Sequence, residues 1–270
     1  MIGRLLMLDA FRALYTYRNL VLQLVKRDIA SRYQGAFLGV AWSLIFPLLT
    51  LAVYGFVFGV VLKPRWPNVE GATQFTLILF SGLLIFNFFS ECVARAPSLL
   101  ISNANFVKKV VFPIEVLIWV PIATALFHLM LGLFAWFVLN LLIGDGVSWS
   151  FLLFPLAVAP LILLVAGLSW FLSALGVYVR DVAQVIGVSM QLLLYLGPII
   201  YPREVLPESV RWVMLLNPLT IPVEQFRNVV NFGISIDWQI ILIFWLVALV
   251  ICRLGMLFFE KCRHGFADVV

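Results

Sequence analysis

Few ionisable side chains interrupt the long apolar stretches of this sequence, and these few are its first candidates for chemistry. They are Glu91, Glu115, His128 and Arg253, and all except His128 lie close to the ends of their stretches. A transporter driven by protons or sodium ions usually carries a carboxylate near the middle of the bilayer, and no such carboxylate is evident. His128 leaves two interpretations open: a proton relay, or a hydrogen-bonded histidine that packs between helices.

Sequence motifs of enzymes and nucleotide-binding proteins are absent. The chain has no GxxxxGKS/T phosphate loop, no HExxH, no GxSxG and no CxxC. The three cysteines (Cys92, Cys252 and Cys262) give an odd count without paired spacing, so neither a disulfide framework nor a metal cluster is indicated. The sequence therefore predicts no catalytic residue, no metal site and no cofactor on this chain.

Aromatic side chains are abundant, with 24 Phe, 9 Trp and 7 Tyr. Trp42 and Phe46 are four residues apart, as are Tyr54 and Phe58, so each pair shares one face of a helix. Aromatic faces inside a pore can stack against sugar rings weakly enough to let a polymer slide. The same residues also suit lipid contact and interfacial belts. The candidates for a channel lining are Trp42, Phe46, Tyr54, Phe58, Tyr195 and Tyr201.

The composition defines the class of protein that must position these residues. Of the 270 residues, 64% are hydrophobic and 11% are charged, and the mean hydropathy is +1.10. Soluble domains contain about 45–50% apolar and about 25% charged residues. A chain this apolar cannot cover its own core in water. The sequence predicts an all-α integral membrane protein, because helices satisfy their backbone hydrogen bonds within lipid.

Six apolar runs are candidate transmembrane helices, since about 20 residues are needed to cross a bilayer. They cover 37–62, 75–93, 116–143, 151–179, 185–201 and 236–259. We therefore divide the chain into an N-terminal cytoplasmic segment, 1–36, and a six-span domain, 37–270. The segment 1–36 is too short for a catalytic domain. Any energy-coupling domain must then belong to another chain.

The distribution of positive charge predicts the orientation in the membrane. Twelve of the 18 Lys and Arg residues lie in the N-terminal segment, after the second and fourth runs, and after the sixth. Five lie in the connections on the opposite face. The positive-inside rule then places both termini in the cytoplasm. The net charge of +5 reflects this bias rather than nucleic-acid binding.

The segment from Asp9 to Tyr33 has apolar residues at helical spacing with basic residues between them. This pattern is typical of an amphipathic helix on the cytoplasmic membrane surface, with its basic residues near lipid phosphates. The alternative is a cytoplasmic helix packed on a partner protein.

The connection 94–113 is longer than a turn and begins with the helix-start signal Pro97-Ser98. A short helix here would present Leu99, Leu100 and Ile101, which suits docking to another protein. The alternative is a solvated loop with Lys108 and Lys109 as interfacial anchors.

Residues 202–235 combine apolar stretches with four prolines and three glutamates. They predict two short helices, 208–216 and 221–232, which are too short to cross about 30 Å of hydrocarbon. Broken helices at membrane depth occur where they are buried in protein or line a cavity. We expect a re-entrant hairpin on the external side, which could act as a gate.

Several short motifs, in order along most of the chain, resemble one family. They are Arg27-Asp28, Arg32-Tyr33, Leu38-Gly39, Trp42, Pro47, Lys109-Val110, Phe112-Pro113, Glu115, Gly197-Pro198-Ile199, Tyr201-Pro202, Asn217-Pro218 and Phe226-Arg227. This pattern resembles the type 2 ABC-transporter permeases that export bacterial polysaccharides such as O-antigen, capsule and teichoic acid. The likeness identifies the family and no particular polymer.

The resemblance implies a homodimer in the bacterial cytoplasmic (inner) membrane. It would be paired with two copies of a separate ATPase that binds ATP and Mg, and no nucleic acid would be bound. The substrate would be a glycan carried on undecaprenyl diphosphate. Arg27 and Arg32 would bind that diphosphate, or would serve as plain interfacial anchors. The helix that couples the permease to the ATPase would include Ser98, Leu99, Leu100, Asn103, Lys108 and Lys109. The external gate would include Pro202, Glu208, Asn217, Pro218, Glu224 and Arg227.

Three other functions remain as alternatives. A permease of the same superfamily that exports a small drug or lipid would share the fold, but would have a narrower and more apolar dimer interface. A secondary transporter would work without an ATPase, which the lack of midplane carboxylates and of a visible repeat disfavours. An intramembrane enzyme would need paired catalytic residues, and none is evident.

Overall fold

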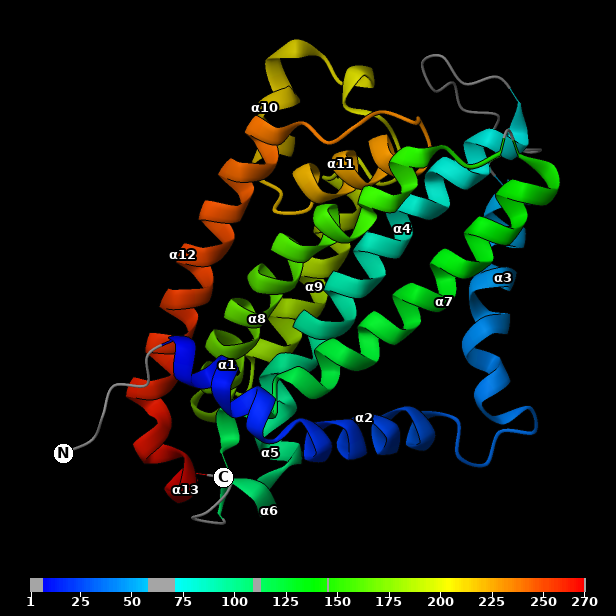
Figure 1. The fold of residues 1–270 in the computed structure, drawn as a ribbon. Helices are drawn as coiled ribbons and strands as arrows, with labels where there is room; N and C mark the ends of the chain where they lie inside the picture. Colours follow the sequence, from blue (N-terminus) through cyan, green and yellow to red (C-terminus); the bar gives the residue numbers. More distant parts are fainter. Residues whose placement is uncertain (1–6, 58–70, 109–112, 145, 270) are drawn as a thin grey trace.

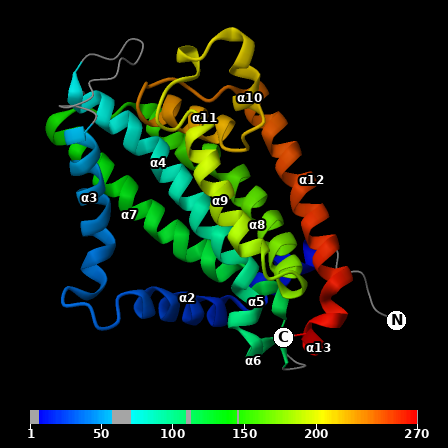
Figure 2. The same cartoon turned by 180° about the vertical axis from the view of Figure 1, so that it is seen from behind.

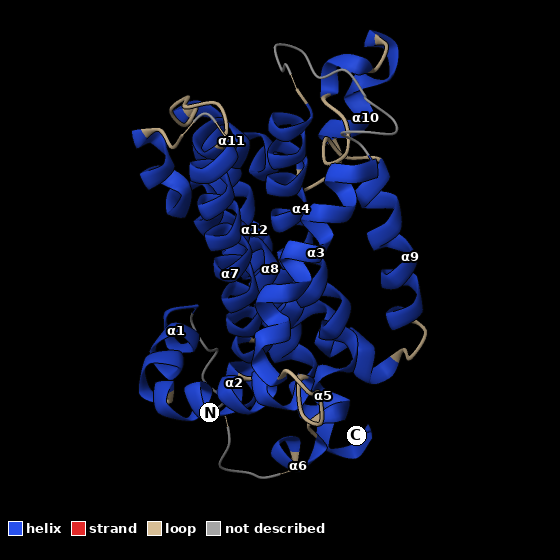
Figure 3. Cartoon of the chain, turned by 90° about the vertical axis from the view of Figure 1, so that its right-hand side faces the viewer, coloured by secondary structure: helices blue, strands red, loops and turns tan. Residues whose placement is uncertain are grey.

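The structure is a computed structural model that describes residues 7–57, 71–108, 113–144 and 146–269. Within these ranges the chain forms helices and connecting loops and no strand (Figure 3). Four helical stretches are long and apolar enough to cross a membrane: Ala72–Ser102, Ile114–Ile143, Trp149–Tyr178 and Trp238–Gly265. The predicted all-helical class is confirmed, and these four stretches coincide with the second, third, fourth and sixth predicted spans.

The four long helices of these stretches are α4 (Ala72–Arg95), α7 (Trp119–Ile143), α8 (Phe154–Tyr178) and α12 (Trp238–Cys262). Helix α4 packs against both α7 and α8 and is the most buried of the four (Figure 1). Helices α8 and α12 approach most closely at two glycines, since a Cβ on Gly255 would lie 2.0 Å from the carbonyl oxygen of Gly167. Small residues at such crossings let the helix backbones touch. Glycine is therefore required here by packing.

Two shorter apolar helices occupy the first and fifth predicted spans. Helix α3 (Trp42–Tyr54) continues as helical turns to Val57, beyond which the rest of the predicted span lies outside the described residues. Helix α9 (Val182–Tyr195) has 14 residues, which rise about 21 Å at 1.5 Å each and fall short of about 30 Å of hydrocarbon. The helix ends before Gly197-Pro198, which interrupt the predicted run 185–201, because proline cannot continue the backbone hydrogen bonds.

The N-terminal segment forms two helices, α1 (Met7–Thr16) and α2 (Arg18–Arg32), which meet at Tyr17. The prediction of one continuous helix is therefore wrong. Helix α2 crosses one end of the bundle and packs on α7 (Figures 1 and 2). It buries Val21, Leu24 and Val25. These three residues of its apolar face thus pack on the protein's own helices, whereas Leu22 is exposed.

The connection after α4 forms three short helical pieces: η3 (Ala96–Ser98), α5 (Leu99–Ser102) and α6 (Ala104–Val107). The predicted short helix is present, but Leu99 and Leu100 are buried within the chain. The prediction that these two leucines present a docking surface is therefore wrong. Exposure falls on Ser98, Ile101, Ser102 and Lys108, whereas Lys109 lies outside the described residues.

At the other end of the bundle, residues 203–230 form η6 (Arg203–Val205), η7 (Glu208–Val210), α10 (Arg211–Leu215) and α11 (Thr220–Val230). These helices match the two predicted at 208–216 and 221–232. They lie far from α2, above the bundle in Figure 1. Helix α11 packs on α4 and α8, and most of its residues are buried. A role as a gate stays a prediction.

Candidate functional site: an amphipathic cavity with an ion network

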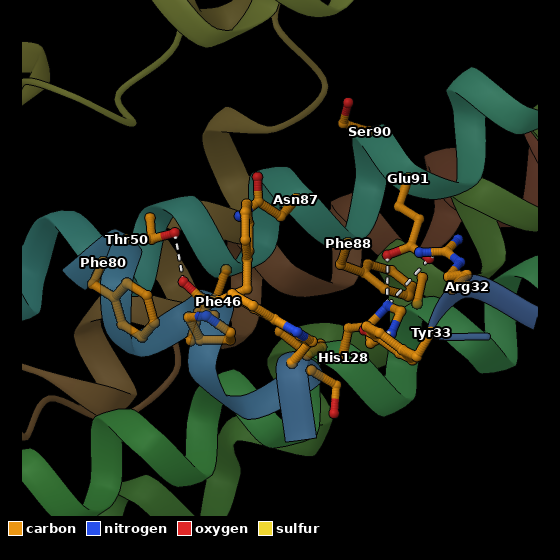
Figure 4. A pocket seen from close by; sticks show the side chains of 16 residues that line it. Arg32, Tyr33, Phe46, Thr50, Phe80, Asn87, Phe88, Ser90, Glu91 and His128 are labelled. Carbon is orange, nitrogen blue, oxygen red and sulfur yellow. Dashed lines mark hydrogen bonds and ion pairs between the residues drawn. The ribbon is translucent and has the colours of Figure 1, made fainter. Parts of the chain in front are cut away.

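A cavity of about 510 Å³ lies between α3, α4 and α7 and is closed at one end by the last residues of α2. Its aromatic lining comes from Tyr33, from Trp42 and Phe46 of α3, and from Phe80 and Phe88 of α4. Figure 4 shows Phe80, Thr50 and Phe46 toward one side and an ionic cluster at the other. Mostly apolar walls with a few polar groups, in a volume of this size, are typical of binding sites for small molecules.

Glu91 is the centre of the ionic cluster. One carboxylate oxygen, Oε1, lies 2.5 Å from Arg32 Nη2, and the other, Oε2, lies 3.0 Å from His128 Nδ1. The hydroxyl of Tyr33 lies 3.3 Å from the remaining ring nitrogen of His128. With its proton on Nδ1, neutral His128 donates to Glu91 and accepts from Tyr33. The structure thus supports the packing interpretation of this histidine, since both ring nitrogens are occupied.

A second ion pair lies one helical turn away. Arg95 Nη1 and Nη2 donate to the two carboxylate oxygens of Asp28 at 2.9 and 2.6 Å, a bidentate geometry that strengthens the pair. Burial raises the pKa of Asp28, but the hydrogen bonds and charge of Arg95 outweigh it and hold the pKa below its ordinary value. Asp28 of α2 thus pairs with Arg95 of α4, and Arg32 at the end of α2 pairs with Glu91 of α4. These four charges fasten α2 to α4.

The aromatic residues predicted to line a channel do not form one cluster. Trp42 and Phe46 line the cavity, whereas Tyr54, Tyr195 and Tyr201 are not among its lining residues. Tyr201 donates its hydroxyl to the carbonyl of Tyr195, which is exposed on α9. Phe58 lies outside the described residues. The lining aromatics Phe80 and Phe88 were not predicted, because their run has no distinguishing pattern.

Arg27 and Arg32 have different surroundings and do not form one site. Arg32 is held by Glu91. Arg27 is exposed and lines a second cleft, of about 390 Å³, between α2 and the η3–α5 connection. Ser98 and Asn103, both predicted for the coupling helix, line the same cleft. Arg27 is therefore a neighbour of the coupling connection.

Arg227 of α11 is buried, with 3% of its surface exposed. Its guanidinium donates to the carbonyl of Ile78 in α4 at 3.1 Å, and to the carbonyls of Pro198 and Ile199 after α9. Gly82 makes room for it, since a Cβ there would lie 2.2 Å from Arg227 Nη2. Arg227 fastens three segments together, and its side chain is not part of an exposed gate surface.

Among the other predicted gate residues, Asn217 is also an anchor. Asn217 is buried, donates to the carbonyl of Leu193 at 2.8 Å and accepts from the backbone N–H of Leu219 at 2.9 Å. Pro202 is buried, Pro218 and Glu224 are partly buried, and Glu208 is exposed.

No group of three His, Cys, Asp or Glu side chains that could hold a metal occurs among residues 7–57, 71–108, 113–144 and 146–269.

Four apolar helices that are long enough to cross a membrane define the class as a multi-pass membrane protein, with a ligand-sized cavity beside two of them. Residues 19–231 match the family model of the ABC-2 type transporter. The match covers most of the chain, and the chain belongs to this family.

The chain is also similar to named transport proteins over 77–98% of its length. The chain is 30% identical over 266 residues to the O-antigen export system permease protein RfbA of Myxococcus xanthus, covering 98% of this chain and 100% of the relative. It is 25% identical over 257 residues to RfbA of Klebsiella pneumoniae, covering 93% and 95% of the two chains. It is also 25% identical over 212 residues to the polysialic acid transport protein KpsM of Escherichia coli, covering 77% and 79%.

Proposed function

We propose that this chain is the membrane-spanning permease subunit of an ATP-driven exporter that moves a lipid-linked polysaccharide out of the cytoplasm. The observation that carries this function is the alignment with an O-antigen export permease over 98% of this chain and all of the relative. A match of this extent leaves little of the chain for a domain of another kind. The chain is a transport subunit, and ATP and Mg bind to the partner ATPase.

The proposed topology puts the α2 end of the bundle in the cytoplasm. The distribution of Lys and Arg supports this orientation, with both termini inside. The four long helices cross the inner membrane, and α3 and α9 complete six passes with their flanking turns. Helices α10 and α11 then form the external re-entrant segment, in which buried Arg227 holds α11 in place.

The exposed face of the coupling connection is where we place the ATPase, in two copies for a permease homodimer. Ser98, Ile101 and Ser102 are exposed there, beside the cleft that Arg27 lines. Because Arg95 precedes η3 and is bound to Asp28, movement of the connection would be passed to α2. The permease would thus transmit ATP hydrolysis to the cytoplasmic end of the substrate path.

For the substrate, we propose that Trp42 and Phe46 form part of the glycan channel. The diphosphate of the lipid carrier would meet Arg27 first, because Arg27 is exposed. Arg32 could bind the diphosphate only by exchanging its bond to Glu91.

The test substitutes an exposed residue of the coupling connection. Ile101 is 43% exposed, so Ile101→Asp leaves the core intact and places a charge on the proposed ATPase face. We expect export of surface polysaccharide to fall at least about tenfold, the effect of losing about 1.4 kcal/mol of interface energy. Surface glycan is quantified against the amount of permease in the membrane.

The matched control is Val205→Asp, at the opposite end of the bundle, where Val205 is 58% exposed. We expect near-normal export from this variant. Equal export by both variants would remove the docking assignment. Normal surface polysaccharide in cells that lack this chain would contradict the proposed export function.

A further inference from the structure

The relatives are named for two kinds of polymer, O-antigen and polysialic acid. The charges that line the cavity indicate whether this chain is suited to a charged or an uncharged polymer. A polysialic acid carries a carboxylate on every sugar unit, whereas many other glycans carry none. A site that follows an acidic polymer needs cations that are free to meet it. The charge state of the cavity lining is therefore informative about the substrate.

The described residues that line the cavity carry balanced charge. Its guanidinium, that of Arg32, lies 2.5 Å from Glu91 and is neutralised by it. Both ring nitrogens of His128 are occupied by Glu91 and Tyr33. Arg95, the next cation along α4, is bound to Asp28. An anion entering this cavity would meet paired cations and the carboxylate of Glu91.

The rest of the lining is suited to an uncharged polar ligand. Trp42 and Phe46 offer exposed aromatic faces, with 37% and 67% of their surfaces exposed, whereas Phe80 and Phe88 of the lining are buried. The exposed amide of Asn87 makes no hydrogen bond with the described residues and can both donate and accept. Thr50 donates its hydroxyl to the carbonyl of Phe46 at 2.8 Å, which leaves its oxygen free to accept. Aromatic faces beside neutral hydrogen-bonding groups match the apolar and hydroxyl faces of a sugar ring.

We infer that this cavity binds an uncharged, hydroxyl-rich sugar unit of the exported glycan and discriminates against acidic sugars. The inference rests on the proposed function and adds the class of sugar. Its physical basis is desolvation. A carboxylate that leaves water for this cavity gains no free cation in return, which is unfavourable, and the nearby charge of Glu91 repels it. A neutral sugar exchanges hydrogen bonds with water for hydrogen bonds with Asn87 and Thr50.

The test compares two probes of equal length on the permease–ATPase complex in lipid nanodiscs. The probes are a neutral tetrasaccharide of mannose and a tetramer of sialic acid, and binding is followed by saturation-transfer NMR. We expect the neutral tetramer to bind at least about tenfold more tightly, the effect of one unmatched charge. Phe46→Ala should weaken neutral binding about fivefold, as expected for one stacking contact. Phe134→Ala removes another exposed aromatic, with 58% of its surface exposed, that lies outside the cavity, and should leave binding unchanged.

A gain-of-charge variant tests the electrostatic basis independently. Asn87 is exposed, so Asn87→Lys should fold and would add a cation that is not already paired. We expect this variant to bind the sialic acid tetramer about tenfold more tightly than the wild type does. A second variant, Glu91→Gln, leaves the charge of Arg32 without a neutralising carboxylate and should shift the preference in the same direction.

Binding of the acidic tetramer by the wild type as tightly as the neutral one would overturn the inference and leave the proposed function standing. Binding of neither tetramer would overturn it as well. Polysaccharide export by the same cells separates the two claims. Normal export would leave the proposed function standing, and absent export would contradict the proposed function as well. Unchanged discrimination in Asn87→Lys would contradict the electrostatic argument.

Discussion

Replacing Arg227 by alanine is expected to destabilise the protein by about 2–5 kcal/mol, the cost of leaving buried carbonyls without donors. The guanidinium holds the carbonyls of Ile78, Pro198 and Ile199. Its removal would release α11 from α4 and from the segment after α9. Thermal unfolding in detergent, followed by the loss of monodisperse protein, measures the effect.

The control for Arg227 is Arg211→Ala. Arg211 is only partly buried, donates to the carbonyls of Leu206 and Glu204 at 3.0 and 3.3 Å, and lies 3.9 Å from the exposed carboxylate of Glu208. Because water can replace these partners, we expect their loss to cost only about 1 kcal/mol. Gly82→Ala should resemble the Arg227 variant, because its Cβ would occupy the space of the guanidinium. Equal stability of the Arg227 and Arg211 variants would show that the buried arginine is not an anchor.

The second large effect is expected for Glu91→Ala. This substitution leaves Arg32 and His128 without their shared acceptor, at the point where α2 meets α4 and α7. Breaking a largely buried ion pair by removing one partner costs about 3–5 kcal/mol, and the partial exposure of this one lowers the expectation to about 2–3 kcal/mol. The backbone amides near the end of α2 should then exchange with solvent about tenfold faster or more, as measured by hydrogen–deuterium exchange.

An acidic residue outside the network provides the comparison. Glu208→Ala changes a carboxylate that is 91% exposed and should leave exchange in α2 unchanged. Glu91→Gln retains the size and an acceptor oxygen, so its effect should be intermediate. If α2 exchanges at the wild-type rate in Glu91→Ala, the ion network does not hold this helix.

The helical architecture could be predicted because composition and apolar run length determine it. Four long helices lie where the apolar runs predict them. The two helices α10 and α11 also agree with prediction, because the surrounding prolines restrict where helices can begin and end. The number of membrane passes is less accessible, since α9 contains only 14 helical residues.

Burial within the short connection could not be predicted from local sequence. Leu99 and Leu100 were expected at a docking surface because a short apolar stretch between spans has no partner that the sequence reveals. In the fold, η3 packs directly on α8, where a Cβ on Gly176 would lie 2.1 Å from the carbonyl oxygen of Pro97. A contact between residues so distant in the chain leaves no periodic signal.

The ion network had a signal in the sequence that single-residue reasoning missed. Asp28 and Arg32 are four residues apart, and so are Glu91 and Arg95. Each pair therefore places opposite charges on one helix face, and two such faces can pair crosswise. The interpretation of Arg32 as a phosphate ligand or interfacial anchor, and of Glu91 as a residue at a span end, separated two halves of one cluster.

The measurement that tests the account most directly is purification of the chain from its native membrane in a mild detergent, with ATPase activity assayed on the eluate. The account predicts a stoichiometric ATPase subunit that is retained by the wild type and reduced in Ile101→Asp. A stable oligomer of this chain alone, without ATPase activity, would contradict an ATP-driven exporter and would favour a transporter that works without a partner.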